Sequence, residues 1–421
     1  MKEFVPPAIV QNQFESVREL FAKNVVPSYG RFDLALSHGE GSYVFDVAGK
    51  RYLDLASGIA TNCLGHAHPA IIRALVEQSK KLIHVSNLYY TEPQGKLAAE
   101  IIKRIGPGKV FFCNSGAEAN EGLYKVARKF GHDEGRFEIL TATNSFHGRT
   151  LAGIAATGQE KVKKGFEPMT PGFRHIPYND LEAARNAVSP ATVAILIEGV
   201  QGEGGVTPAT SQYLLGLRQL CNEKKLLLFM DGVQCGHYRT GRFQSFQTIV
   251  GNSDFLPDGL SMAKSLGGGF PIGAFWLRAP YQDVLGAGTH GTTFGGTPLA
   301  CAVALKILEV IEKENLAVNA DKVGAWLKSE IGRLAQTYPT VVKSARGLGF
   351  MLGLELQEKI PAFAASDKTP AIQLTNRLHA AGLMVVPAGN NIVRLLPPLN
   401  LKPQEAGEGI SIIEQVVKSL A

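Results

Sequence analysis

The sequence predicts an α/β fold built on a mostly parallel sheet, with a second, smaller α+β domain. Two observations point to it. Short apolar runs that suit strands buried on both faces alternate with helical patterns, and the clearest runs are "KVFFC", "FEILTAT", "ATVAILIEG" and "KLLLFMD". The chain also has 421 residues, which exceeds one typical domain, and its composition of 45% hydrophobic and 19% charged residues is that of a globular protein.

The remaining elements follow in chain order. "ESVRELFAKNVVP" predicts an amphipathic helix ended by Pro27, and "GSYVFDVAGKRYLDLASG" predicts a hairpin. After residue 298, "PLACAVALKILEVIEKENL" predicts a long helix. "VKSARGLGFMLGLEL", "AIQLTNRLHAAGLMVV" and "NIVRLLPPL" are interpreted as strand, helix and strand. We therefore expect an N-terminal segment (1–65) that packs with the small domain, a large domain (66–310) and a C-terminal small α+β domain (311–421).

Composition argues against several classes of function. The net charge of +6 comes without a long basic run, so nothing favours nucleic-acid binding. The five cysteines form no CxxC pair, which argues against a zinc site or a disulfide framework and fits a reducing compartment. No uncharged apolar run approaches the roughly 20 residues of a membrane span, and the N-terminus lacks the pattern of a secretion signal. We expect a cytoplasmic protein.

Candidate binding residues follow the predicted strands, because ligands of parallel sheets collect beyond the carboxyl ends of the strands. Ser115, Gly116 and Ala117 come after "KVFFC" and open a helix. Small residues with free backbone N–H groups at a helix N-terminus make a phosphate site. The alternative is an ordinary N-cap by Ser115 or Asn114, which this stretch alone favours.

Two charged residues stand in unusually apolar surroundings. Asp231 follows "KLLLFM", where a carboxylate is costly unless a cation meets it; a capping or ion-paired aspartate is the alternative. Lys264 lies in "PDGLSMAKSLGGGFPIGAF", whose only other charge is Asp258. Taken alone, Lys264 is more typical of a surface lysine whose amine reaches solvent.

Together these features match what pyridoxal 5′-phosphate requires. The helix N-terminus suits the phosphate, and Asp231 suits a protonated pyridine nitrogen. Lys264 suits a Schiff base with the aldehyde, since apolar surroundings lower the pKa of a lysine and keep its amine nucleophilic.

Six segments in order resemble the class III (ω-amino acid) aminotransferases, a family of fold-type I pyridoxal-phosphate enzymes: "NSGAEANE", "SFHGRT", "EGVQGEGGV", "DGVQCGHYRTG", "PDGLSMAKSLGGGFPIGA" and "HGTTFGGTPLAC". The resemblance runs over most of the chain and implies a seven-stranded type of sheet between helices. It implies that Lys264 carries the cofactor and Asp231 meets its pyridinium nitrogen. It further implies that Phe146 and Val233 pack on the two faces of the cofactor ring and that Gln234 hydrogen-bonds its phenolic oxygen. Ser115, Gly116 and Ala117 would bind the phosphate. Thr293 would reach across a homodimer interface to the phosphate of the partner subunit.

The resemblance also implies substrate contacts. Arg149 would hold the carboxylate far from the reacting amine, and Arg394 the α-carboxylate of glutamate. Glu203 would pair with Arg394 while the other substrate is bound. The alternative for either arginine is a structural salt bridge. No metal is implied.

Within the family, "ASGIATNCLGHAHPAI" and "VRLLPPLNL" are most similar to the acetylornithine branch. Ornithine-specific members resemble the chain at the substrate residue Tyr29 but carry a tyrosine where this chain has Ile59, and isoleucine suits a donor whose α-nitrogen is acylated. We therefore expect transfer of the terminal amine of N2-acetylornithine to 2-oxoglutarate, in arginine biosynthesis. Ornithine, succinylornithine, 4-aminobutyrate and diaminopimelate-pathway donors stay open. The Glu203–Arg394 pair argues against a decarboxylase or an aminomutase.

The chain departs from the family pattern at two positions. Gly232 replaces a glutamate after Asp231, and Thr297 replaces an asparagine. Neither departure removes a chemical group assigned above. His147 is expected near the cofactor, and structural roles are expected for His66, His68, Glu198, Arg239 and Arg242.

Overall fold

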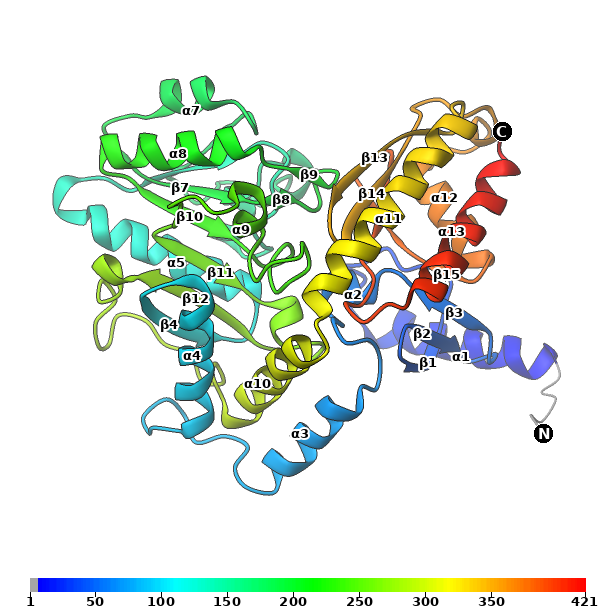
Figure 1. Ribbon diagram of the computed structural model, residues 1–421, viewed down its shortest axis with the longest axis horizontal. Coiled ribbons are helices and arrows are strands. Elements are labelled where there is room, and N and C mark those ends of the chain that lie inside the picture. The colour runs from blue at the N-terminus through cyan, green and yellow to red at the C-terminus, as the bar shows by residue number, and fades with distance from the viewer. Residues whose placement is uncertain (1–6) are drawn as a thin grey trace.

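The computed structural model describes residues 7–421, which form two bodies joined by the long helices α10 (Pro298–Lys313) and α11 (Leu316–Thr337) (Figure 1). The larger body contains a seven-stranded sheet. Its order is β4 (Gly108–Cys113), β12 (Gly273–Arg278), β11 (Gly259–Met262), β10 (Leu227–Asp231), β7 (Thr192–Glu198), β5 (Glu138–Ala142) and β6 (Phe173–Ile176). Strand β12 is antiparallel to both neighbours and the other pairs are parallel, so the mostly parallel sheet is confirmed.

Helices cover both faces of this sheet, as its uninterrupted apolar strands require. Along β10, Leu227 and Phe229 pack toward α5 (Gly116–Gly131), whereas Leu228 and Met230 pack toward α8 (Ser211–Lys224). The other helices of this body are α4 (Glu92–Ile105), α6 (Leu151–Ala156), α7 (Leu181–Ala187) and α9 (Ser245–Val250), with the short strands β8 (Val200–Gln201) and β9 (Thr207–Pro208) beside the sheet. Residues of successive strand positions therefore face two separate cores.

The second body joins the two ends of the chain. One sheet has the order β1 (Leu36–Glu40), β2 (Tyr43–Asp46), β3 (Arg51–Asp54) and β15 (Leu383–Met384); the other has the order β13 (Val342–Leu348), β14 (Met351–Leu356), β17 (Ile392–Leu395) and β16 (Val386–Ala388). Because β3 pairs with β15, the N-terminal strands are hydrogen-bonded to the C-terminal part. Helices α12 (Pro370–Ala380) and α13 (Pro403–Lys418) complete this body, and α2 (Ser57–Ala60) and α3 (Pro69–Ser79) lead out of it. Domain limits at residues 65 and 310 remain our proposal.

Two predicted elements differ from the structure. "AIQLTNRLHAAGLMVV" was interpreted as a helix throughout, but α12 ends at Ala380 and the short strands β15 and β16 follow it. "VKSARGLGFMLGLEL" was interpreted as a single strand, but it is the antiparallel hairpin β13–β14, which turns at residues 349 and 350. The segment contains no Pro, Asn or Asp to mark the turn, and β14 is buried along its whole length.

The large sheet brings the candidate residues to one edge. Strands β4, β11, β10 and β7 run in the same direction, so their carboxyl ends meet there. Asp231 ends β10 and is the register partner of Glu198, which ends β7. Ser115 follows β4 by two residues, and Lys264 follows β11 by two. This edge is where a ligand of an open parallel sheet is expected.

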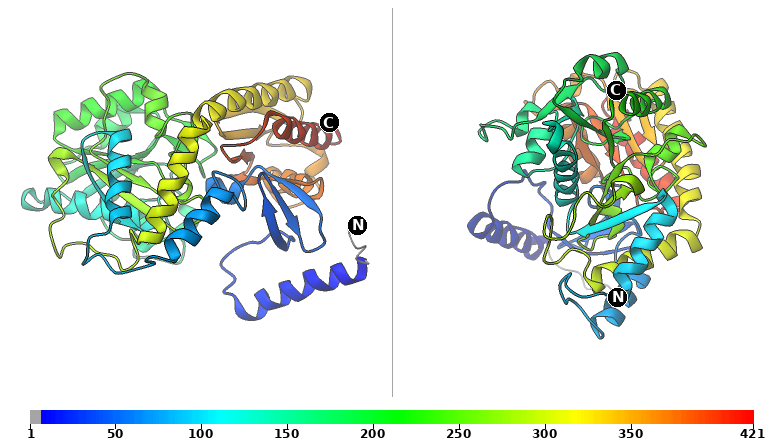
Figure 2. Two further views of the ribbon diagram at one scale, coloured as in Figure 1. Left: turned by 60° about the horizontal axis from the view of Figure 1, so that its bottom comes forward. Right: turned by 90° about the vertical axis from the view of Figure 1, so that its left-hand side faces the viewer.

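Helix α1 (Pro7–Asn24) extends away from both bodies (Figure 2). Within residues 7–421, no helix is both long and apolar enough to cross a membrane. The same residues contain no cluster of three or more metal-binding side chains.

Candidate active site

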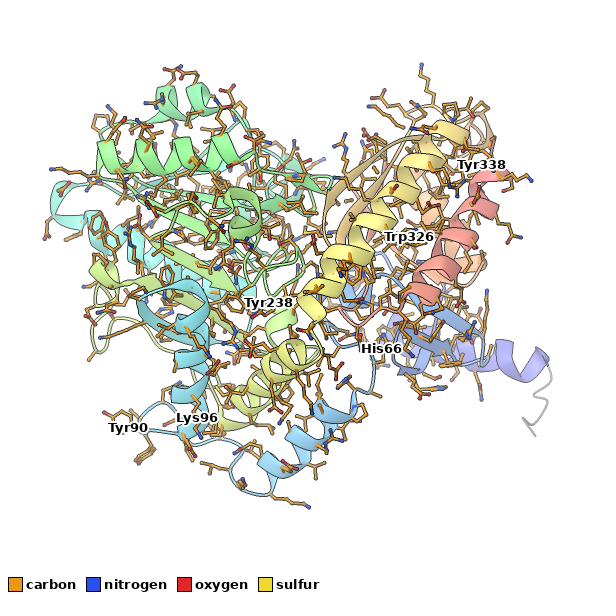
Figure 3. All side chains as sticks on the ribbon, viewed as in Figure 1. His66, Tyr90, Lys96, Tyr238, Trp326 and Tyr338 are labelled. Atoms are coloured by element: carbon orange, nitrogen blue, oxygen red, sulfur yellow. The ribbon has the colours of Figure 1, made fainter. Side chains whose placement is uncertain are left out.

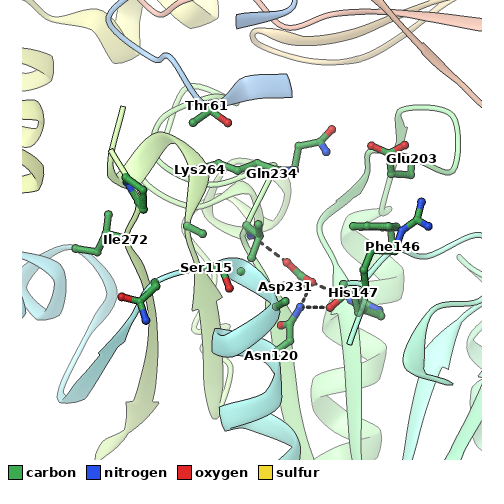
Figure 4. Close-up of a pocket in the computed structure, with 18 of the residues that line it drawn as sticks. Thr61, Ser115, Asn120, Phe146, His147, Glu203, Asp231, Gln234, Lys264 and Ile272 are labelled. Atoms are coloured by element: carbon green, nitrogen blue, oxygen red, sulfur yellow. Dashed lines mark hydrogen bonds and ion pairs between the residues drawn. The ribbon is translucent and has the colours of Figure 1, made fainter. Parts of the chain in front are cut away.

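A cavity of about 460 Å³ opens at the carboxyl edge of the large sheet (Figure 4). The sequence-predicted residues that line it are Ser115, Gly116, Ala117, Phe146, Arg149, Glu203, Asp231, Val233, Gln234 and Lys264. They come from five separate segments of the chain. The lining also includes His147, which was expected near the cofactor, and polar residues that the sequence did not single out for the site, namely Thr61, Asn114, Asn120 and Glu198.

Lys264 enters the cavity from the turn after β11. Its φ of 45° lies in the left-handed region, which costs energy for a residue with a side chain and is tolerated where the fold enforces it. Burial lowers the pKa of its amine below the ordinary value, against the smaller opposing effect of Glu203. A larger fraction of this amine is therefore neutral, and so nucleophilic, than for a lysine in water.

Asp231 is held by three donors. Its Oδ2 lies 2.8 Å from Asn120 Nδ2 and 2.8 Å from His147 Nδ1, and its Oδ1 accepts from the Val233 backbone N–H at 3.0 Å. Burial acts to raise the pKa of Asp231, but the hydrogen bond and charge of His147 and the other donors outweigh it and hold the pKa below its ordinary value. A buried, ionised carboxylate therefore faces the cavity.

Asn120 is a functional residue that the sequence analysis missed. It is four residues after Gly116 on α5, so it lies on the helix face that the phosphate-site residues share. The spacing of four residues from Gly116 is the signal in the sequence that points to Asn120. Asn120 also donates to the backbone carbonyl of His147 at 3.0 Å. The two residues that contact Asp231 Oδ2 are therefore hydrogen-bonded to each other.

The start of α5 is both a cap and an anion site. Ser115 is the N-cap, and its hydroxyl accepts from the Glu118 backbone N–H at 3.2 Å, as the simpler prediction held. The first backbone N–H groups of a helix still lack intrahelical partners, and those of Gly116 and Ala117 border the cavity. A Cβ at Gly116 would lie 2.6 Å from Val233 Cγ1, so glycine is needed for this helix end to meet the Val233 loop.

Arg394 and Glu203 form an ion pair beside the cavity. Arg394 on β17 is 2% exposed, and its Nη1 donates to Glu203 Oε1 at 2.6 Å and to Gln234 Oε1 at 3.2 Å. Burial acts to raise the pKa of Glu203, but Arg394 outweighs it and lowers the pKa below its ordinary value. The pair is therefore charged, and a substrate carboxylate has to displace Glu203 to reach this arginine.

Arg149 differs from Arg394 in being available. It is exposed, it stacks over the Phe146 ring at 5.5 Å, and it forms no ion pair with any residue between 7 and 421. Of the two predicted arginines, Arg149 lines the cavity and has a free fork, whereas Arg394 lies beside the cavity and is occupied by Glu203.

Four predicted residues lie outside the lining of this cavity, namely Arg394, Tyr29, Thr293 and Ile59. Tyr29 is 75% exposed, and Thr293 is exposed while its neighbour Thr292 accepts from Asn114 Nδ2 at 3.1 Å. Ile59 borders a second cavity of about 750 Å³, which Arg394 also lines. A single chain does not bring Tyr29 or Thr293 to the candidate site.

The two departures from the family pattern have local explanations. Thr297 caps α10, because its hydroxyl accepts from the Ala300 N–H at 3.3 Å. At Gly232 a Cβ would lie 2.4 Å from Oε1 of the fully buried Gln244. The Gln244 carboxamide therefore fills the space beside Gly232 that a larger side chain would need.

The other polar residues make structural contacts. His66 pairs with Asp54 at 2.7 Å, and His68 accepts from the first turn of α3. Arg239 is fully buried and donates to the carbonyls of Phe350 and Pro397, which connects the two bodies. Arg242 contacts the carbonyl of Gly251 at 3.4 Å.

Comparison with known proteins identifies the family. The Aminotransferase class-III family model matches residues 25–417. The chain belongs to this family. It is 44% identical to the acetylornithine aminotransferase of Gloeobacter violaceus, over 96% of this chain and 98% of that protein, and 42% identical to that of Methanocaldococcus jannaschii, over 92% and 94%.

Solved structures agree with this class-III assignment. The ornithine aminotransferase of Toxoplasma gondii ME49 superposes with a TM-score of 0.89 at 30% identity, covering 99% of both chains. The acetylornithine aminotransferase of Elizabethkingia anophelis gives 0.83 at 33% identity, covering 96% of this chain and 99% of that one. The fold is therefore that of the fold-type I aminotransferases.

The cofactor of this class-III aminotransferase is pyridoxal 5′-phosphate. The residues present fit it. The N–H groups at the start of α5 suit its phosphate, the ionised Asp231 suits a protonated ring nitrogen, and the free amine of Lys264 suits its aldehyde. Because Gly116 has no side chain, Val233 can pack against the start of α5 at the cavity wall.

Proposed function

We propose that this aminotransferase moves the terminal amine of N2-acetylornithine to 2-oxoglutarate, giving N-acetylglutamate 5-semialdehyde and glutamate, as a step of arginine biosynthesis. The observation that carries the proposal is the contrast between the free Arg149 in the cavity and the occupied Arg394 beside it. An enzyme that alternates between two substrates with different carboxylate positions needs such an arrangement. The names of the relatives at 42–44% identity support the donor.

Each residue has a part in the transfer. When bound, pyridoxal phosphate supplies an electron sink for the substrate carbon. The Asp231 carboxylate would hold a proton on the ring nitrogen, and Val233 and Phe146, which line the cavity, would hold the ring between them. Lys264, whose pKa is lowered by burial, would take the proton from the carbon that carries the terminal amine.

The two arginines sort the two substrates. With the amino donor, Glu203 stays on Arg394 and the donor's carboxylate binds Arg149. With 2-oxoglutarate or glutamate, Glu203 leaves, Arg394 takes the α-carboxylate, and Arg149 takes the distal one. Gln234 contacts Arg394 at 3.2 Å, so it connects this exchange to the cofactor site.

Ile59 favours an acylated donor. Its side chain borders the cavity that Arg394 also lines, and it offers no hydrogen-bonding group to a free α-amine. Ornithine is the second candidate donor, because solved ornithine aminotransferases superpose closely on this chain.

The enzyme works as a homodimer in this proposal. Large apolar side chains are exposed on two segments, near the end of α1 and before α4: Leu20, Phe21, Val26, Tyr29, Leu88, Tyr89 and Tyr90. Tyr90 points away from the molecule (Figure 3). Exposed apolar side chains of this size are suited to contact with another copy of the chain. A second copy would bury it and place Thr293 against the partner subunit's phosphate site.

The test is a single half-reaction. Purified protein loaded with pyridoxal phosphate is mixed with N2-acetylornithine, N2-succinylornithine, ornithine or 4-aminobutyrate without any keto acid, and visible absorbance follows conversion to the pyridoxamine form. We expect N2-acetylornithine to react fastest. Faster conversion by ornithine or 4-aminobutyrate would show that the donor is wrong.

A further inference from the structure

Glu198 is a second buried carboxyl group in the cavity. It ends β7 as the register partner of Asp231, is 6% exposed and lines the cavity wall. Unlike Asp231, Asp258 or Glu203, it forms no ion pair with any residue between 7 and 421. A buried carboxyl group without a cation is costly, so its retention needs an explanation.

Its side chain connects two segments that the reaction uses. Oε2 accepts from the backbone N–H of Phe146 at 3.2 Å, and Oε1 accepts from the N–H of Gly202 at 3.4 Å. Phe146 lies at the cavity beside the cofactor site, and Gly202 directly precedes Glu203. One carboxyl group thus holds a ring-contact residue and the residue before the ion-paired glutamate.

We propose that Glu198 is a positioning residue that fastens the Phe146 segment (144–148) to the Glu203 segment (199–203), and so sets how readily Glu203 releases Arg394. This inference rests on the proposed function. Burial, and after it the neighbouring Asp231, raise the pKa of Glu198 well above its ordinary value. A neutral carboxyl group explains how it persists beside the ionised Asp231.

The consequence is a bias between half-reactions. A fixed Glu203 keeps Arg394 neutralised, which favours the amino donor, and a loosened Glu203 frees Arg394 for the α-carboxylate of glutamate. Removing the Glu198 carboxyl group should therefore shift the ratio of the two half-reaction rates toward glutamate.

The first readout uses cofactor-free protein. Amide hydrogen exchange by mass spectrometry compares wild type, Glu198→Ala and Glu198→Gln. We expect Glu198→Ala to lose protection in peptides covering 144–148 and 199–203, because both acceptors are gone, with partial rescue by Glu198→Gln. Glu138→Ala is the matched control: Glu138 adjoins the other end of β7, where it accepts from Thr192 Oγ1 at 2.8 Å. It should leave both peptides protected.

The second readout is the ratio of half-reaction rates, glutamate over N2-acetylornithine. Loss of hydrogen bonds to a buried group predicts about a fivefold or larger rise in Glu198→Ala, with Glu198→Gln and Glu138→Ala within about twofold of wild type. Unchanged exchange and an unchanged ratio in Glu198→Ala would overturn the inference. If wild type converts neither substrate, the proposed function itself fails.

Discussion

At the scale of single residues, the site works by giving similar side chains different surroundings. Asp231 is ionised because three donors meet it, whereas the neighbouring Glu198 receives two backbone N–H groups and no cation. Arg394 is paired and Arg149 is free. Residue type alone therefore does not assign a role; the partners do.

Lys264 gives a prediction on pH. Burial lowers its pKa in the folded state, so between that value and the ordinary 10.5 the unfolded chain binds more protons than the folded one. In that pH window, Lys264 therefore makes the free energy of unfolding of the cofactor-free protein increase with pH. In Lys264→Met that contribution disappears, and urea unfolding between about pH 8 and 10 should show a flatter slope than wild type. Parallel slopes would contradict the account.

Arg149 gives a prediction on substrate affinity. Arg149→Lys keeps the charge but loses the planar fork, so the KM for both substrates should rise about tenfold while kcat falls much less. Steady-state kinetics measure both constants. Arg242→Lys, at a site far from the cavity lining, is the control and should behave as wild type. A fall in kcat without a change in KM would mean that Arg149 does not bind the carboxylate.

At the scale of elements, the loop between β10 and α9 explains how the chain keeps its chemistry without the usual glutamate. Gln244 comes just before α9 and lies against Gly232 and Gly236, with Oε1 2.4 and 2.5 Å from the positions of their missing Cβ atoms. The buried carboxamide of Gln244 thus packs against the loop that carries Val233 and Gln234. The sequence showed the departure at Gly232 but not its partner twelve residues later.

This pairing predicts a rescue. Gly232→Glu forces a larger side chain against Gln244, and overpacking of this kind costs about 1–3 kcal/mol, so the Kd for pyridoxal phosphate should rise roughly tenfold or more. Adding Gln244→Ala should restore most of the affinity, while Gln244→Ala alone should have a small effect. Cofactor titration measures each variant. A double variant as weak as Gly232→Glu would show that the two positions are independent.

At the scale of the whole molecule, the sequence predicted the large sheet and most residues of the cavity, but contacts between two subunits cannot be checked in a single chain. Apolar strand runs and the residues after them located Asp231 and Lys264, because parallel strands bring their carboxyl ends to one edge. The hairpin β13–β14 was missed because no Pro, Asn or Asp marks its turn at residues 349 and 350. Tyr29 and Thr293 do not line the cavity of a single chain. The prediction that Thr293 acts across a homodimer interface therefore remains a prediction.

The dimer proposal predicts complementation. Lys264→Ala and Thr293→Val subunits, each impaired alone, are unfolded together and refolded as a mixture. If Thr293 acts across the interface, mixed dimers contain one site with both defects and one with neither. The mixture should then regain activity, approaching about a quarter of wild type for random pairing of equal amounts. Activity equal to the average of the separate variants would contradict a shared site.

The most direct test of the central claim is isotope transfer. N2-acetylornithine labelled with ¹⁵N at its terminal amine is incubated with 2-oxoglutarate and the purified enzyme, and mass spectrometry follows the glutamate formed. We predict one labelled glutamate for each N-acetylglutamate 5-semialdehyde, with no transfer by Lys264→Ala. Labelled ammonia without labelled glutamate, or no consumption of the donor, would contradict the account.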